Sequence, residues 1–146
     1  MIAGRNSNNL LCSLVQPLAP LILLVDDFSD ALEMYEEYFT YRGFRIVTAA
    51  SGPEAVLIAS GPDRPALILM DLEMRGMSGR EALRTLRANP TLDGVPILAF
   101  TAHALAAERD IAMRDGFDAV ISKPCLPDDL IAIVEPYLAQ HRSATA

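Results

Sequence analysis

The chain has 146 residues, of which 51% are hydrophobic, a size and composition that suit one globular domain with a single core. Its formal net charge is −7 and its pI is about 4.7, the wrong sign for a surface that binds nucleic-acid phosphates or anionic lipid, so direct nucleic-acid binding is not expected. No apolar run approaches the roughly 20 residues of a membrane-spanning helix. We therefore expect no membrane insertion and a cytoplasmic location.

The two cysteines and the first residues of the chain suggest no reactive or targeting function. Cys12 and Cys125 are too few and too far apart for a disulfide framework, so we interpret both as free thiols in a reducing compartment. The Asn and Pro content of the first residues indicates flexibility, and their apolar patch is too short for an export signal. The expected organisation is an N-terminal extension at 1–19, one domain at 20–141 and a C-terminal tail at 142–146.

Along the rest of the chain, short apolar runs alternate with segments of helical periodicity. Two of the helical segments begin with a capping box, in which Ser is followed three residues later by Glu: Ser51 with Glu54, and Ser78 with Glu81. Pro136 is expected to interrupt the last helix, because it lacks a backbone donor. Strands are predicted at 21–25, 44–48, 66–70, 96–100 and 118–122, and helices at 29–42, from 51 to about 59, from 78 to Asn89-Pro90, at 104–115 with Gly116 as cap, and from about 127.

Five strand-helix units in alternation predict a doubly wound α/β domain with a five-stranded parallel sheet, because parallel strands require right-handed crossover connections. We find no internal repeat and no long linker in the sequence. Only one helix and a short tail are predicted after Pro124, so we expect no separate output domain.

Four of the predicted strands end at a reactive polar residue. The runs LILLVDD, ALILMD, PILAFT and DAVISK end at Asp26 and Asp27, Asp71, Thr101 and Lys123. Buried parallel strands bring their carboxyl ends to one edge of the sheet, so these side chains should meet there. Two carboxylates about 5 Å apart repel by roughly 3 kcal/mol at an effective dielectric of 20. A cation is therefore expected among the acids, and hard oxygen ligands favour Mg2+.

The order of these motifs resembles the receiver domain of bacterial two-component response regulators, in a stand-alone form similar to chemotaxis regulators. The resemblance rests on the acidic pair, the strand leading to DLEMRGMSG, Thr-Ala and Ser-Lys-Pro, and it covers about residues 21–138. It implies a flavodoxin-like three-layer sandwich with strand order 2-1-3-4-5. It also implies a cis peptide bond before Pro124.

The resemblance implies a role for each site residue. Asp71 is the expected phosphoacceptor, with a histidine kinase or a histidine phosphotransfer protein as donor, and Thr101 and Lys123 are expected to contact the phosphoryl group. The expected output is contact with an unknown downstream protein, and self-dephosphorylation is expected to be slow at most. Mg2+, with Mn2+ as a substitute, is expected to bind Asp26, Asp27, Asp71 and the backbone carbonyl of Glu73.

The sequence departs from the family pattern at several positions near the site. Val120 stands where many receivers have Tyr or Phe, so an aromatic rotamer switch is missing or replaced. Arg75 occupies a common Pro position and is interpreted as a solvated loop charge, with partner recognition as the alternative. Cys125 stands in place of a common Phe. Glu73 and His103, each two residues beyond a site residue, are expected to flank the path of attacking water and to set phosphate lifetime.

Two other functions remain open from the sequence. A phosphatase similar to the haloacid dehalogenases would also use an aspartyl phosphate and Mg2+, but Glu73 and Arg75 stand where it would carry a second Asp and a Thr. An adaptor of receiver fold that works without phosphorylation is suggested by Val120, although the complete set of acids, Thr and Lys argues against it.

Overall fold

The computed structural model describes residues 19–145. The predicted N-terminal extension lies outside the described residues except for Ala19, and so does Cys12. Cys125 is a free thiol, as predicted.

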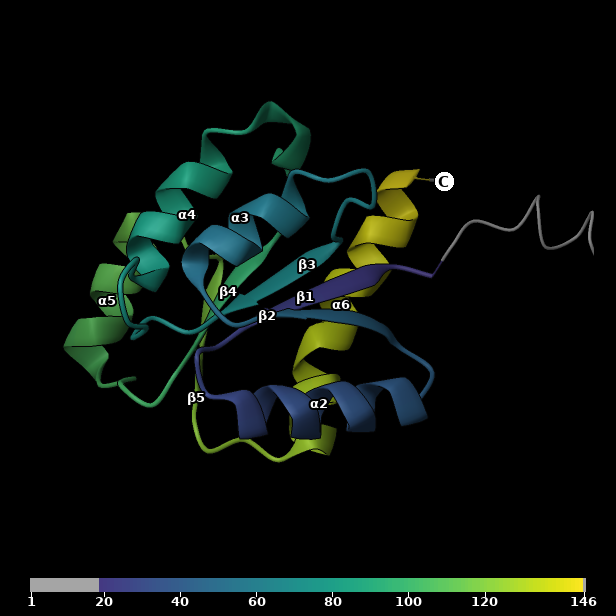
Figure 1. The fold of residues 1–146 in the computed structure, drawn as a ribbon, viewed down its shortest axis with the longest axis horizontal. Coiled ribbons are helices and arrows are strands. Elements are labelled where there is room, and N and C mark those ends of the chain that lie inside the picture. The colour runs from purple at the N-terminus through teal and green to yellow at the C-terminus, as the bar shows by residue number, and fades with distance from the viewer. Residues whose placement is uncertain (1–18, 146) are drawn as a thin grey trace, which may run out of the picture.

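A five-stranded parallel sheet forms the centre of the molecule (Figure 1). Its strand order is β2-β1-β3-β4-β5, which confirms the predicted order and the doubly wound α/β class. All residues of β1, β3 and β4 are buried, so these strands are apolar without alternation, as expected for strands covered on both faces. The strands are β1 (Leu21–Val25), β2 (Arg45–Ala49), β3 (Leu67–Met70), β4 (Ile97–Thr101) and β5 (Ala119–Ser122).

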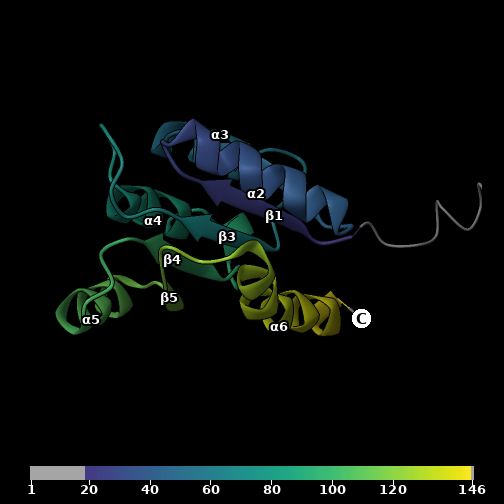
Figure 2. The same ribbon diagram turned by 90° about the horizontal axis from the view of Figure 1, so that it is seen from below.

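Helices cover both faces of the sheet and create two separate cores (Figures 1 and 2). One core packs α2 and α6 against side chains such as Ile22 and Leu24, and the other packs α3, α4 and α5 against side chains such as Leu23 and Val25. Successive residues of β1 therefore serve opposite cores. The helices are α2 (Ser29–Tyr41), α3 (Gly52–Ala59), α4 (Gly79–Arg87), α5 (Ala106–Asp115) and α6 (Pro127–Thr145), with a short 3-10 helix η1 (Pro90–Leu92) after α4.

Local signals in the sequence explain where most helices begin and end. The hydroxyls of Ser51 and Ser78 accept hydrogen bonds from the backbone N–H three residues on, so both predicted N-caps are confirmed. Gly116 ends α5 with φ of 114°, a left-handed conformation that favours glycine. The prediction that α5 begins at residue 104 is wrong by two residues, because Leu105 is extended and its N–H binds the Glu108 carboxylate.

The prediction that Pro136 interrupts the last helix is wrong. Helix α6 continues through Pro136 to Thr145, beyond residue 141 where we placed the end of the domain. Leu130 and Val134 before the proline and Leu138 after it are all buried in the same core. Packing of this apolar face holds the helix together despite the missing donor of Pro136.

Within the described range, no helix is long and apolar enough to cross a bilayer.

Candidate functional site

The reactive residues predicted at the strand ends meet at the carboxyl edge of the sheet. Asp26 and Asp27 follow β1, Asp71 follows β3, Thr101 ends β4 and Lys123 follows β5. Backbone hydrogen bonds continue between neighbouring strands at these residues, from Asp71 N to Val25 O at 3.0 Å and from Lys123 N to Thr101 O at 2.8 Å. The sheet itself therefore positions the backbone of the site.

Three carboxylates form a compact cluster in this edge. Asp26, Asp27 and Asp71 each offer an oxygen that lies within 4.8 Å of the others. Asp26 and Asp71 are 4% and 8% exposed, and Asp27 is partly buried. At this separation each charged pair repels by roughly 3 kcal/mol at an effective dielectric of 20. A donor set of oxygens alone, with excess negative charge, fits a hard divalent cation such as Mg2+.

Lys123 supplies positive charge beside this cluster. Its Nζ lies 2.5 Å from Asp26 Oδ2 and 3.6 Å from Asp71 Oδ2. The ammonium also lies 5.0 Å from the centre of the Phe100 ring, within range of a cation–π interaction. The resemblance leads us to expect Lys123 near the phosphoacceptor Asp71, and the structure places its ammonium nearer still to Asp26. Asp26 is the more deeply buried of the two acids, and a buried carboxylate needs a partner for its charge.

Burial changes the acidity of Asp71. Loss of solvent around the carboxylate raises the pKa of Asp71 to about 6, while the charge of Lys123 and a hydrogen bond from Glu73 N lower it and the charges of Asp26 and Asp27 raise it. The Glu73 N–H donates to Asp71 Oδ1 at 3.2 Å, which holds the start of the following loop against the acid. Asp71 is therefore a carboxylate with a raised proton affinity near neutral pH, suited to nucleophilic attack.

The loop after β4 brings two further groups to the mouth of the site. Thr101 is fully buried, and its hydroxyl accepts a hydrogen bond from His103 N at 3.0 Å. The His103 ring reaches across to the loop after β3, where Nε2 lies 3.1 Å from Glu73 Oε2. The two side chains are 55% and 65% exposed, so they lie at the rim.

The loop after β3 is tied to the acidic pair through Arg75. Its backbone N–H donates to Asp27 Oδ2 at 3.0 Å, and its guanidinium Nε lies 3.8 Å from the same oxygen. The Arg75 side chain is 95% exposed, as a solvated loop charge or a residue that meets a partner would be. Val120, the position of the missing aromatic residue, is partly buried on β5. The Lys123–Pro124 peptide bond is cis, as the resemblance implies.

Two residues that support the site were missed by sequence reasoning. A Cβ built on Gly79 would lie 2.2 Å from the carbonyl oxygen of Asp71, so only glycine lets α4 approach this backbone. Tyr35 lies on the buried face of α2, and its hydroxyl donates to the carbonyl of Cys125 at 2.7 Å. The Tyr35 ring also packs edge-on against Phe100, at 5.6 Å between centroids. No local sequence pattern signals either contact.

A cleft opens over the cluster and carries apolar side chains on one side. Asp26, Asp27, Asp71 and Lys123 line its polar part. Phe28 and Met34, at the start and middle of α2, line the apolar part and are 62% and 45% exposed.

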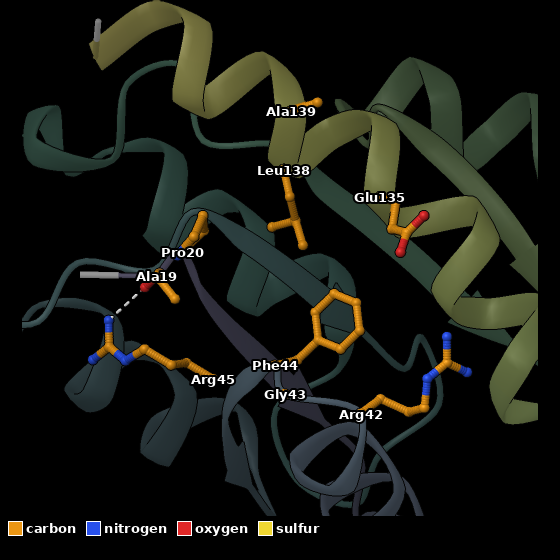
Figure 3. A pocket seen from close by; sticks show the side chains of 9 residues that line it. All are labelled: Ala19, Pro20, Arg42, Gly43, Phe44, Arg45, Glu135, Leu138 and Ala139. Carbon is orange, nitrogen blue, oxygen red and sulfur yellow. Dashed lines mark hydrogen bonds between the residues drawn. The ribbon is translucent and has the colours of Figure 1, made fainter. Parts of the chain in front are cut away.

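A second hollow lies at the opposite end of the sheet, around the start of β1 and the end of the α2–β2 connection (Figure 3). Phe44 and Leu138 are the largest apolar side chains that line it. Its two arginines are already paired, Arg42 with Asp128 and Arg45 with Asp63, and Arg45 also donates to the carbonyl of Ala19 at 2.7 Å. This hollow lacks the reactive cluster of the carboxyl edge, which we therefore take as the candidate site.

Comparison with known proteins shows that most of the chain is similar to receiver domains. Residues 22–135 match the model of the response regulator receiver domain. The chain is 33% identical over 124 residues to an uncharacterized 14.6 kDa protein in the sodA1 3' region of Leptolyngbya boryana, covering 84% of this chain and 94% of that protein. It is 34% identical over 119 residues to sensor protein GacS of Pseudomonas syringae, covering 80% of this chain but only 13% of that protein.

Among solved structures, the fold matches the receiver domain of sensor histidine kinase PA1611 from Pseudomonas aeruginosa, with a TM-score of 0.75 and 30% identity. The match covers 84% of this chain and 99% of that domain, which is described with a magnesium ion coordinated in its active-site cleft. Family match, fold and strand order agree, and the chain belongs to the response regulator receiver domain family.

Proposed function

We propose that this chain accepts a phosphoryl group on Asp71 from the phosphohistidine of a histidine kinase or of a histidine phosphotransfer protein. The reaction depends on Mg2+, with Mn2+ as a substitute, and the phosphorylated chain signals by contact with another protein. It works in the cytoplasm, where ATP sustains such kinases. The domain that runs from residue 20 to the end of α6 at Thr145 carries this function, with 1–19 as an extension.

One observation carries the proposal. Three carboxylates from two neighbouring strands converge within 4.8 Å, and an ammonium from a third strand lies 3.6 Å from the acid that follows β3. A structural role alone would not require so much negative charge in a buried position. The donors of Asp26, Asp27 and Asp71, with the backbone carbonyl of Glu73, would hold Mg2+, whose charge would reduce the repulsion met by an incoming phosphate.

The chemistry is a displacement at phosphorus. An Asp71 carboxylate oxygen attacks the phosphoryl group, a P–O bond forms, the P–N bond to the donor imidazole breaks, and that nitrogen takes a proton. The product is an acyl phosphate. The Lys123 ammonium can stabilise the negative charge that develops on the phosphoryl oxygens. The Thr101 hydroxyl can donate to a phosphoryl oxygen while it accepts a hydrogen bond from His103 N.

The surroundings of the site suit contact with a protein donor. Exposed Phe28 and Met34 beside the cleft, and Leu126 just after the Lys-Pro loop at 70% exposure, give an apolar rim to a charged site. Similarity to GacS, named as a sensor protein, is consistent with a place in such signalling. On the output side, α5 presents exposed Ile111 and Met113, and Leu105 just before the helix is also exposed, so this face offers apolar contacts to a downstream protein.

The two alternatives predict different behaviour. The receiver family consists of signalling domains, so we expect one phosphoryl group per chain with at most slow self-dephosphorylation. A phosphatase would release phosphate from a phosphomonoester with steady turnover. An adaptor independent of phosphorylation would bind its partner equally well with Asp71 replaced by Asn.

Labelling of the intact chain tests the proposal directly. Acetyl phosphate with Mg2+ should label the protein once, through a bond that alkali and hydroxylamine cleave, and the Asp71→Asn variant should take no label. The control is Asp63→Asn, which removes a surface carboxylate that binds Arg45 far from the site. Undiminished labelling of the Asp71→Asn protein contradicts the assignment.

A further inference from the structure

Arg109, an exposed residue on the first half of α5, connects two segments of the chain that flank the site. Its guanidinium donates through Nε to the carbonyl of Ala104 at 2.9 Å. Through its two terminal nitrogens it donates to the carbonyl of Val120 at 3.2 Å and to the hydroxyl of Ser122 at 2.9 Å. One planar guanidinium thus reaches both the β4–α5 loop and β5, a geometry that its fork of fixed donors allows.

Both segments lead directly to site residues. Ala104 lies three residues after Thr101, in the loop whose His103 N–H binds the Thr101 hydroxyl. Ser122 precedes Lys123, whose ammonium lies between Asp26 and Asp71. The Arg109 contacts therefore bridge the segments that carry the hydroxyl and the amine of the site.

The absence of a large aromatic side chain at Val120 on β5 leaves the Arg109 hydrogen bonds as the described link between the loop and this strand. Val120 offers no large ring that could fill or leave the space between the loop and β5, and its backbone carbonyl accepts a hydrogen bond from Arg109. The link between loop and strand consists of three hydrogen bonds from a charged donor, the stronger class of hydrogen bond.

We propose that Arg109 is a positioning residue that clamps the β4–α5 loop against β5 and so restrains Thr101. This inference rests on the proposed function, because the restrained step is acceptance of a phosphoryl group at Asp71. Any force that draws the Thr101 hydroxyl toward that group is passed through His103 N to the loop, and Arg109 holds the far end of the loop at Ala104. Release of the clamp lets the Thr101 hydroxyl approach a phosphoryl group on Asp71 more easily.

Three variants of the full chain test the clamp. Arg109→Gln removes the charge and the fork, and Arg109→Lys keeps the charge but replaces the planar fork by a single ammonium. Arg114→Gln is the matched control, because Arg114 is exposed on the same helix and makes no hydrogen bond to either segment among the described residues. The measurements are the initial rate of labelling by acetyl phosphate with Mg2+, the half-saturating concentration of beryllofluoride, amide exchange of residues 102–105, and the urea unfolding midpoint.

With Arg109→Gln we expect several-fold faster labelling, several-fold tighter beryllofluoride binding and faster exchange at 102–105, with Arg109→Lys between it and the parent and Arg114→Gln equal to the parent. A merely structural role would speed exchange and lower the unfolding midpoint without raising the labelling rate, and that result overturns the proposal. Slower labelling of Arg109→Gln also overturns it, since the clamp would then support the reactive geometry. If the parent takes no label at all, the proposed function fails, whereas equal labelling of parent and Arg109→Gln rejects the clamp alone.

Discussion

Glu73 and His103 face each other across the mouth of the acid site, with His103 Nε2 3.1 Å from Glu73 Oε2. Each residue stands two positions beyond a group of the site, Glu73 after Asp71 and His103 after Thr101, and both remain more than half exposed. The pair joins the loops after β3 and β4 at the rim. Water that attacks a phosphoryl group on Asp71 would approach past these two side chains.

We therefore expect Glu73→Asn and His103→Ala each to change the rate of dephosphorylation several-fold, which corresponds to about 1 kcal/mol in barrier. The sign depends on whether the carboxylate orients water or repels it, but neither variant should abolish labelling. The loss of label is followed over time at several values of pH. Glu37→Gln on α2, an exposed acid away from the site, is the control, and unchanged decay in both rim variants would place these side chains outside the reaction path.

Removal of the divalent cation should stop labelling at Asp71. Excess EDTA should abolish incorporation from acetyl phosphate, and either Mg2+ or Mn2+ should restore it, because the buried acids otherwise repel the phosphate dianion. Asp27→Ala should require a higher Mg2+ concentration for half-maximal labelling, since it removes one oxygen ligand from the cluster. Equal labelling with and without EDTA would argue against a metal in the reaction.

The raised pKa of Asp71 predicts how stability varies with pH in the metal-free protein. The pKa of Asp71 is about 6 in the folded state, whereas its ordinary value, which applies to the unfolded state, is 3.8. The folded state therefore binds the Asp71 proton more tightly than the unfolded state does. The unfolded state therefore holds fewer protons in this window, and the free energy of unfolding falls as pH rises from about 4 to about 6. At neutral pH the full effect is about 3 kcal/mol.

Asp71→Asn should remove this dependence, so the variant should be more stable than the parent at neutral pH in EDTA. Its advantage should grow by about 1 kcal/mol between pH 5 and pH 7.5. Urea unfolding at the two pH values measures the difference. A constant difference between the two proteins would mean that burial does not raise the Asp71 pKa.

Gly79→Ala should harm the site through the backbone of Asp71. The added Cβ would lie 2.2 Å from the Asp71 carbonyl oxygen, so α4 or the loop must shift, at a cost of about 1–3 kcal/mol. We expect a lower urea midpoint together with slower labelling. Ser78→Ala is the control, because it weakens the same helix start by about 1 kcal/mol without adding volume beside Asp71. Normal labelling in both variants would show that the loop tolerates displacement.

Phosphorylation should alter the face formed by α5, β5 and α6. The β4–α5 loop is bonded to Thr101 at one end, and Lys123 and α6 follow β5, so changes at the site can reach this face through short connections. Amide exchange before and after addition of beryllofluoride measures the response. Changes confined to the residues around Asp71 would contradict signalling through this face.

Some parts of this structure follow from the sequence alone. The strand ends at Asp71 and Lys123 could be placed because buried parallel strands are short apolar runs, and the N-caps Ser51 and Ser78 because their chemistry is local. The strand order came from the resemblance to a family, since apolar periodicity does not distinguish neighbours in a sheet. Gly79, whose role depends on the approach of distant backbone, escaped sequence reasoning, and Pro136 was misjudged because tertiary packing outweighed a local preference.

The site takes its residues from four of the five strands, so labelling reports on the assembly of β1, β3, β4 and β5. Asp27 and Lys123 stand 96 positions apart in the sequence, and they meet only when β3 and β4, which lie between β1 and β5 in the sheet, have docked. A partly assembled chain would carry all the reactive side chains and still be inert. The ability to accept a phosphoryl group should therefore appear late in refolding and be lost together with the global unfolding transition. A misfolded chain would then carry no phosphoryl group and send no signal.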